Sequence, residues 1–144
     1  GENMFKIGSV FIPVENLATS IRWYEKMLGI IKIDEWEEGN ERGAGFYFPN
    51  DLTQLALIQV EDKQPTQFAI TGNKRNVYFN FLTDDIQGAF NHLKHNNVKV
   101  SEIEDFGGMK CFDFYDLDGN TFSVVNEVES SPYHRDEVRK LQSR

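Results

Sequence analysis

The chain has 144 residues, of which 40% are hydrophobic and 13% aromatic, enough for one compact domain or two small fused halves. Its formal net charge of −8 at pH 7 disfavours nucleic acid and anionic membranes as partners, because both select dense patches of Lys and Arg. Without a long apolar run or an apolar signal segment, and with Cys111 alone unable to form an internal disulfide, the sequence predicts a cytoplasmic protein with no membrane partner.

The first part of the chain predicts a strand, a helix and three more strands. Residues 6–14 are apolar and β-branched, as in a strand. Apolar side chains then recur at helical spacing between Asn16, a plausible N-cap, and Gly29, which ends the helix. Further strands are expected over residues 30–36, 44–48 and 54–60, with the charged stretch EEGNERG as the turn between the first two.

The same order of elements recurs after a polar stretch, residues 61–75, that reads as a linker. Residues 76–82 predict a strand, and TDDIQGAFNHLKHNN predicts a helix with Asp84 or Asp85 near its cap. The stretches VKVSEIE, MKCFDFYD and NTFSVVNE then predict three more strands.

The two parts also match in sequence. VENL before the first helix corresponds to TDDI before the second, and GFYFPNDLTQLAL corresponds to CFDFYDLDGNTFSV with one gap. Such a repeat predicts an α+β fold of two βαβββ modules, residues 5–60 and 76–128, followed by a tail at 129–144 with a short helix. Because a lone half would leave one sheet face wet, we expect the modules to pack around a shared cavity.

The stretches SVFIPVENLATSIRWYEKMLG and FYDLDGNTFSVV resemble the vicinal oxygen chelate superfamily, the glyoxalase/bleomycin-resistance/extradiol-dioxygenase group. The resemblance extends over residues 5–128, with Leu117 in place of the usual proline of a D-P-D-G-N turn. It implies the paired-module fold. It leaves the function open, since the superfamily includes isomerases, lyases, dioxygenases, thiol transferases and non-catalytic drug-binding proteins.

The resemblance also indicates where metal-dependent members place their ligands. The corresponding positions here are Ser9, Tyr78, Ser123 and a position near Ala56, with Gln54 as the nearest polar residue on that face. Divalent transition metals select imidazole, thiolate or carboxylate ligands, and a serine hydroxyl gains little by displacing water from the ion. The sequence therefore predicts no metal and no other cofactor.

Side chains alternate between the two faces of a strand, and the resemblance implies that the face with the expected metal positions is the one that lines the cavity. The expected ligand-binding residues are Ser9, Phe11, Tyr47, Gln54, Tyr78, Asn80, Cys111, Asp113 and Ser123. Several have an ordinary structural interpretation. The hydroxyls can bond neighbouring groups, the tyrosines can be half-buried packing residues, and Cys111 can be a small buried hydrophobe.

Asp113 is the weak candidate for a catalytic residue. A carboxylate among aromatic side chains must either find a hydrogen-bond donor or hold a proton more readily than usual. In the second case it could serve as a general base or bind a ligand cation. The ordinary structural alternative is a pair with a nearby Lys or Arg at the rim.

Three functions compete. The first is binding of a small organic molecule, cationic or aromatic, in a metal-free cavity. The second is an enzyme, either metal-free with Asp113 or a tyrosine as acid/base, or using metal ligands elsewhere. The third is a sensor or interaction module that uses the tail, whose Tyr133, Val138 and Leu141 are also the expected contacts of a homodimer. We take the first as the leading hypothesis.

Overall fold

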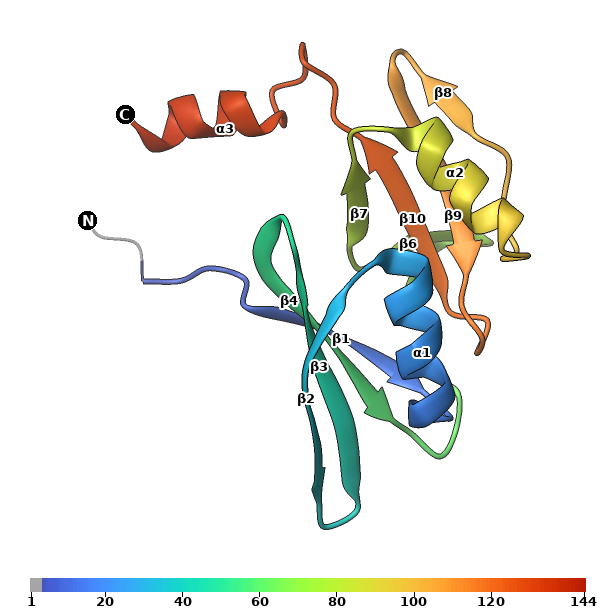
Figure 1. The fold of residues 1–144 in the computed structure, drawn as a ribbon. Coiled ribbons are helices and arrows are strands. Elements are labelled where there is room, and N and C mark those ends of the chain that lie inside the picture. The colour runs from blue at the N-terminus through green and yellow to red at the C-terminus, as the bar shows by residue number, and fades with distance from the viewer. Residues whose placement is uncertain (1–3) are drawn as a thin grey trace. The chain divides into compact units, whose positions relative to one another are not determined.

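A computed structural model describes residues 4–144 and divides the chain into two compact units that join between Pro65 and Thr66 (Figure 1). No helix among residues 4–144 is long and apolar enough to cross a membrane.

The first unit is a four-stranded sheet with one helix. Its elements are β1 (Ser9–Val14), α1 (Leu17–Leu28), β2 (Ile31–Glu38), β3 (Glu41–Phe48) and β4 (Asp51–Gln59). The strand order is β1-β4-β3-β2, with β1 parallel to β4 and the other pairs antiparallel. The predicted order of strand, helix and three strands is confirmed.

Helix α1 begins and ends where the sequence predicts. The side chain of Asn16 accepts a hydrogen bond of 3.0 Å from the backbone N–H of Thr19, which satisfies one free donor of the first turn. Gly29 ends the helix in the left-handed conformation with φ of 67°. The helix packs against β3 and β4, and the buried core of this unit includes Ile12, Val14, Leu17, Ile21, Tyr24, Ala44, Phe46, Leu55 and Leu57.

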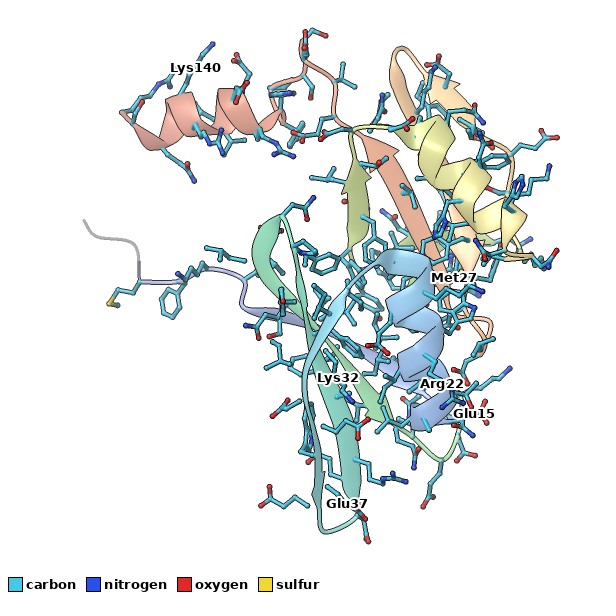
Figure 2. All side chains as sticks on the ribbon, viewed as in Figure 1. Glu15, Arg22, Met27, Lys32, Glu37 and Lys140 are labelled. Carbon is cyan, nitrogen blue, oxygen red and sulfur yellow. The ribbon has the colours of Figure 1, made fainter. Side chains whose placement is uncertain are left out.

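The turn between β2 and β3 is tighter than predicted. It consists of Gly39 and Asn40, and Gly39 has a positive φ of 60°, so the charged residues around it belong to the strands. Glu37, labelled in Figure 2, and Arg42 are cross-strand partners whose charged atoms lie 3.9 Å apart. Their exposure makes this a weak ion pair.

The second unit contains more elements than the sequence predicted. They are β5 (Gln67–Thr71), β6 (Lys74–Val77), β7 (Asn80–Thr83), α2 (Ile86–His95), β8 (Glu104–Phe106), β9 (Met109–Tyr115), β10 (Thr121–Asn126) and α3 (Arg135–Gln142). The four-stranded sheet has the order β7-β10-β9-β8, which matches that of the first unit, and β5 pairs with β6 in a separate hairpin.

The hairpin corrects the prediction of an irregular linker over residues 61–75. Its entry is fixed by Thr66, whose Oγ1 donates to the carbonyl of Thr121 and accepts from the N–H of Thr121, both at 3.0 Å. The expected strand over 76–82 is therefore divided at Tyr78 and Phe79, which lie between β6 and β7.

The expected strand VKVSEIE also forms only in part. Val100 makes a single bridge to Phe114, and β8 starts four residues later. Gly107 and Gly108 have positive φ values of 68° and 100°, so the hairpin into β9 closes there and brings Glu104 opposite Cys111.

Aromatic rings form the core of the second unit. The ring centroids of Phe79 and Phe81 lie 5.9 and 5.8 Å from that of Phe122, which is 5.4 Å from Phe114. Phe90 of α2 meets Phe112 of β9 edge-on at 5.4 Å. Helix α2 thus covers one face of the sheet. Its cap is Asp85, one of the two candidates, which accepts from the N–H of Gly88 at 2.9 Å.

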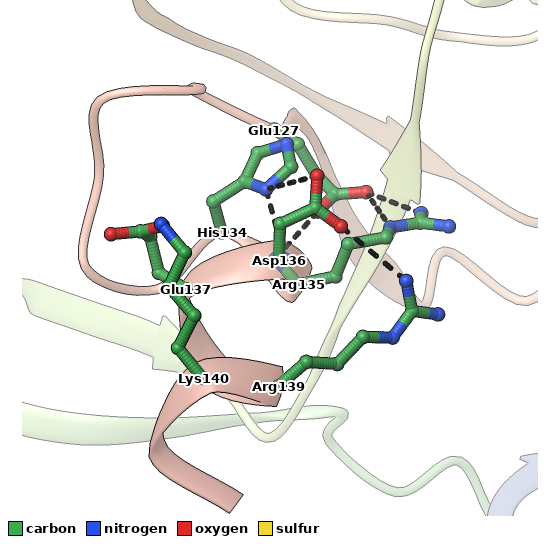
Figure 3. A network of polar contacts seen from close by, with 7 residues as sticks. All are labelled: Glu127, His134, Arg135, Asp136, Glu137, Arg139 and Lys140. Carbon is green, nitrogen blue, oxygen red and sulfur yellow. Dashed lines mark hydrogen bonds and ion pairs between the residues drawn. The ribbon is translucent and has the colours of Figure 1, made fainter. Parts of the chain in front are cut away.

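The tail forms the predicted helix, α3, and polar contacts connect it to the end of β10 (Figure 3). Arg135 Nε donates to Glu127 Oε1 at 2.7 Å, and His134 Nδ1 caps the helix by accepting from the N–H of Asp136 at 3.1 Å. No residue of α3 is buried, so Val138 and Leu141 do not anchor the helix on this chain. Their role in a dimer contact stays a prediction.

Candidate functional site

The site begins with the face of the second sheet that α2 leaves open, which we call the helix-free face. Phe112, Phe114, Phe122 and Val124 are buried on the α2 side. Because side chains alternate along a strand, the opposite face carries Cys111, Asp113 and Tyr115 from β9, Thr121, Ser123 and Val125 from β10, and Asn80 and Leu82 from β7.

Asn80, Ser123 and Asp113 lie side by side across this face, and we call them the polar row. Ser123 is the cross-strand partner of Asn80 on β7 and of Asp113 on β9. Ser123 Oγ donates a hydrogen bond of 2.7 Å to Asp113 Oδ1. On the outer side, Ser101 Oγ accepts from the backbone N–H of Asp113 at 2.8 Å. The strand registers therefore bring three predicted site residues together.

An apolar row lies on one side of the polar row. Leu82 pairs with Val125, and Val125 pairs with Cys111. Leu82 is 59% exposed, whereas Val125 and Cys111 are half-buried. This row offers hydrocarbon surface next to the Asp113 carboxylate.

Tyr115 and Thr121 are cross-strand partners on the other side. The amine of Lys99 lies over the Tyr115 ring, 4.8 Å from its centroid. Tyr115 is thus occupied by a cation from its own chain, a contact that sequence reasoning missed because Lys99 lies outside the predicted cavity strands.

The environment of Cys111 is both partly buried and negative. Burial raises the pKa of the thiol above its ordinary 9.0, and the nearby carboxylates of Glu104 and Asp113 raise the pKa further. A protonated thiol is a poor nucleophile, which agrees with the interpretation of Cys111 as a small packing residue.

The donor that Asp113 required is Ser123. The alternative partner was a Lys or Arg at the rim, but among residues 4–144 no such side chain lies within ion-pair distance of Asp113. Asp113 is half-buried, so its carboxylate is still open to solvent or a ligand.

Tyr78 lies apart from the polar row. It falls in the bend before β7, its side chain is 68% exposed, and its ring contacts Phe68 of the hairpin at 5.2 Å between centroids. The expectation of a half-buried tyrosine was wrong here, because Tyr78 lies in the bend between β6 and β7 rather than within a strand.

The helix-free face of the first sheet carries the remaining predicted residues. Ser9 pairs with Gln54, and Phe11 pairs with Ala56. Phe11 is 65% exposed, and Tyr47 is exposed opposite Ile31 at the register shift between β3 and β4. The convergence of these residues with the polar row of the second unit stays a prediction.

Trp36 is a residue whose position the sequence left open. It pairs with Gly43, and its indole lies so close that a Cβ on Gly43 would be 2.4 Å from Trp36 Cζ2. A Cβ on Gly45 would be 3.8 Å from Trp36 Cζ3. The indole therefore lies over two glycines on the helix-free face. Gly43 and Gly45, at alternate positions of one strand, were the sequence signal that could have predicted this position of the indole, because glycine in a strand leaves room for another group to approach closely.

The residues at the expected metal positions do not fit a divalent transition metal. Ser9 and Ser123 offer hydroxyls, Gln54 an amide, and the Ser123 proton is given to Asp113. Within the described part of the chain, no three His, Cys, Asp or Glu side chains form a group suited to a metal ion.

Each unit contains a strand, a helix and three further strands, and its helix covers only one face of its four-stranded sheet. This arrangement defines an α+β protein built from two βαβββ units. The family model "Glyoxalase/Bleomycin resistance protein/Dioxygenase superfamily" matches residues 6–124, and the chain belongs to this superfamily.

Solved structures share the fold. A superfamily member from Sphaerobacter thermophilus is 24% identical, with a TM-score of 0.70 over 86% of this chain and 98% of that one. TnmS3, an antibiotic binding protein from Streptomyces sp. CB03234, is 14% identical, with a TM-score of 0.70 over 88% and 98%. The fosfomycin resistance protein FosX from Listeria monocytogenes is 10% identical, with a TM-score of 0.66 over 88% and 97%. Among curated proteins, the sequence finds no match.

Proposed function

We propose that the protein binds a small organic molecule against the helix-free faces of its sheets, in a cavity between the two halves, and that binding needs no metal. The observation that carries the proposal is the polar row between an apolar row and Tyr115. Ligand sites typically combine apolar lining with a few placed polar groups. An antibiotic binding protein and a fosfomycin resistance protein among the structural neighbours support a ligand-binding use of this fold.

The test is a search for the ligand with the intact chain. Native mass spectrometry of protein purified from cells should detect a bound small molecule, and a compound library should contain ligands that raise the melting temperature. Trp36 is the local reporter, because it lies on a helix-free face whereas Trp23 lies on α1 against Tyr24. Ligands should change the emission of a Trp23→Phe variant and not that of Trp36→Phe. A library without any binder would refute the proposal.

Metal independence is tested separately. Purified protein should contain no stoichiometric zinc, nickel, iron or manganese, and a chelator should leave both ligand affinity and melting temperature unchanged. One tightly bound ion per chain, together with ligand binding that the chelator abolishes, would contradict this part of the proposal.

An enzymatic function is the second candidate, favoured by the position of Asp113. Its half-buried carboxylate is held by one hydroxyl and has a flank open to a ligand, as an acid/base group would need. Conversion of an identified ligand by the wild type, lost in Asp113→Asn with ligand affinity kept, would establish catalysis. Unchanged ligand after long incubation would support binding alone.

We also propose a cytoplasmic homodimer in which the tail contributes contacts. Tyr133 is 88% exposed and Leu141 53% exposed, so burial against a second copy would remove apolar surface of both side chains from water. Light scattering should give the dimer mass, and Leu141→Glu should shift the mass toward the monomer. A partner protein whose binding survives Asp113→Asn but not Leu141→Glu would instead favour the interaction-module hypothesis.

A further inference from the structure

We propose that the ligand is a cationic amine with an apolar body, and that its ammonium group binds the Asp113 carboxylate. This inference rests on the proposed function and names the chemical class of the ligand. It depends only on residues of the second unit.

The first argument is the distribution of protons in the polar row. A serine hydroxyl has one proton, and that of Ser123 is donated to Asp113 Oδ1. Ser123 therefore presents only lone pairs to a ligand, and the second oxygen of Asp113 is also an acceptor. Asn80 is the one member of the row with side-chain protons left to donate to a ligand. A ligand that supplies several N–H donors matches this row better than one that supplies acceptors.

The second argument is charge. No Lys or Arg among the described residues pairs with Asp113, and the amine of Lys99 lies over the Tyr115 ring instead. Glu104 adds a second carboxylate as the cross-strand partner of Cys111, and besides burial the charges of Glu104 and Asp113 both raise the pKa of the Cys111 thiol. An uncompensated carboxylate on a half-buried surface favours a cation and repels an anion.

The third argument is the hydrocarbon surface beside the carboxylate. Leu82 and Val125 are cross-strand neighbours on the row next to the polar row, and Leu82 is largely exposed. An amine bound to Asp113 can lay a carbon skeleton against them and remove apolar area from water. A bare inorganic cation would gain nothing from this surface, so the observations favour an organic amine.

The experiment compares three probes that share one ring body and differ in the terminal group: phenethylamine, phenethyl alcohol and phenylacetate. Binding to the full chain is measured by NMR titration of backbone amides. We expect the amine to bind roughly tenfold or more tightly than the other two, as for a hydrogen bond to a charged group, with shifts at Asp113, Ser123 and Leu82.

Two variants and a control locate the effect. Asp113→Asn keeps an acceptor for Ser123 and removes the charge, and should abolish the preference for the amine. Ser123→Ala frees Oδ1 and should strengthen amine binding. Glu25→Gln removes one charge from an exposed position on α1 and should leave the preference unchanged. Melting temperatures of the variants show whether each one is folded. If Asp113→Asn fails to fold, Ser123→Ala and the three probes decide.

The results separate this inference from the proposed function. Equal affinity for the amine and the alcohol, or a preference that survives in folded Asp113→Asn, would overturn the inference. Failure of the amine to bind would also overturn it. In both cases a co-purified neutral or anionic compound, detected by native mass spectrometry, would still uphold the binding of small molecules.

Discussion

Ser123 Oγ lies 2.7 Å from Asp113 Oδ1, and the two residues are direct cross-strand partners on β10 and β9. The sequence placed both on one face, but it did not pair them. The bond fixes the carboxylate in the centre of the helix-free face and satisfies one of its two oxygens.

Removing that donor should destabilise the second unit modestly. Ser123→Ala leaves Asp113 Oδ1 without its partner on a half-buried surface, so we expect a loss of about 0.5–1.5 kcal/mol in the free energy of unfolding. Urea denaturation measures the loss, with Ser130→Ala, at an exposed position, as the control. Equal stability of the two variants would show that water replaces the Ser123 hydroxyl without cost.

Gly43 and Gly45 form a matched pair for testing the position of Trp36. A Cβ on Gly43 would meet Trp36 Cζ2 at 2.4 Å and the Leu57 carbonyl at 2.9 Å. Gly43→Ala should therefore cost about 1–3 kcal/mol and shift the emission of Trp36. Around Gly45 the nearest atom would be Asp34 Oδ1 at 3.6 Å, so Gly45→Ala should be nearly neutral. Thermal unfolding followed by tryptophan fluorescence distinguishes them, and similar losses would place the indole elsewhere.

Cys111 should react slowly with iodoacetamide in the folded protein. Burial, then the charges of Glu104 and Asp113, raise the pKa of the thiol above 9.0 and so reduce the thiolate fraction at about pH 8. Glu104→Gln and Asp113→Asn each remove a negative charge, lower the pKa and should speed alkylation, and unfolding should speed it most. Mass spectrometry follows the reaction, with Glu102→Gln as control. A rate unaffected by either variant would contradict the negative environment.

The contact between Glu127 and Arg135 should depend on pH. The hydrogen bond from Arg135 lowers the pKa of Glu127 below its ordinary 4.5, against a smaller opposing effect of burial. A lowered pKa in the folded state means that the contact stabilises the protein above pH 4.5 and is lost as the pH falls through the folded pKa. NMR titration of the Glu127 carboxyl should give a midpoint below 4.5 that returns toward 4.5 in Arg135→Gln. An unchanged midpoint in that variant would mean that α3 is not held at Glu127.

The sequence predicted elements whose signals are local. Asn16, Gly29 and Asp85 mark helix ends through short-range hydrogen bonds and backbone geometry, and all three act as expected. The hairpin β5–β6 was missed because Pro65, Gly72 and polar residues obscure its short alternating strands, and because its position depends on the distant partner Thr121.

The sequence also predicted only part of the candidate site. Alternation, together with the face that the resemblance indicated, placed Cys111, Asp113 and Ser123 opposite Phe112, and the strand registers agree with this placement. The positions of Tyr78 and Lys99 could not be read in this way. Tyr78 sits in a bend created by the hairpin, and Lys99 reaches Tyr115 from a segment with only one strand bridge nearby.

The two hydrogen bonds between Thr66 and the backbone of Thr121 determine where the chain can be cut to produce the second unit as a fragment. A fragment that started at residue 76, the first residue of the predicted second module, would lack Thr66, β5 and the first two residues of β6. The backbone of Thr121 would lose both hydrogen bonds to Thr66, and the β5–β6 hairpin could not form. Fragment expression, circular permutation or domain fusion should therefore cut before Thr66, in the stretch after β4, which leaves the hairpin with the sheet it serves.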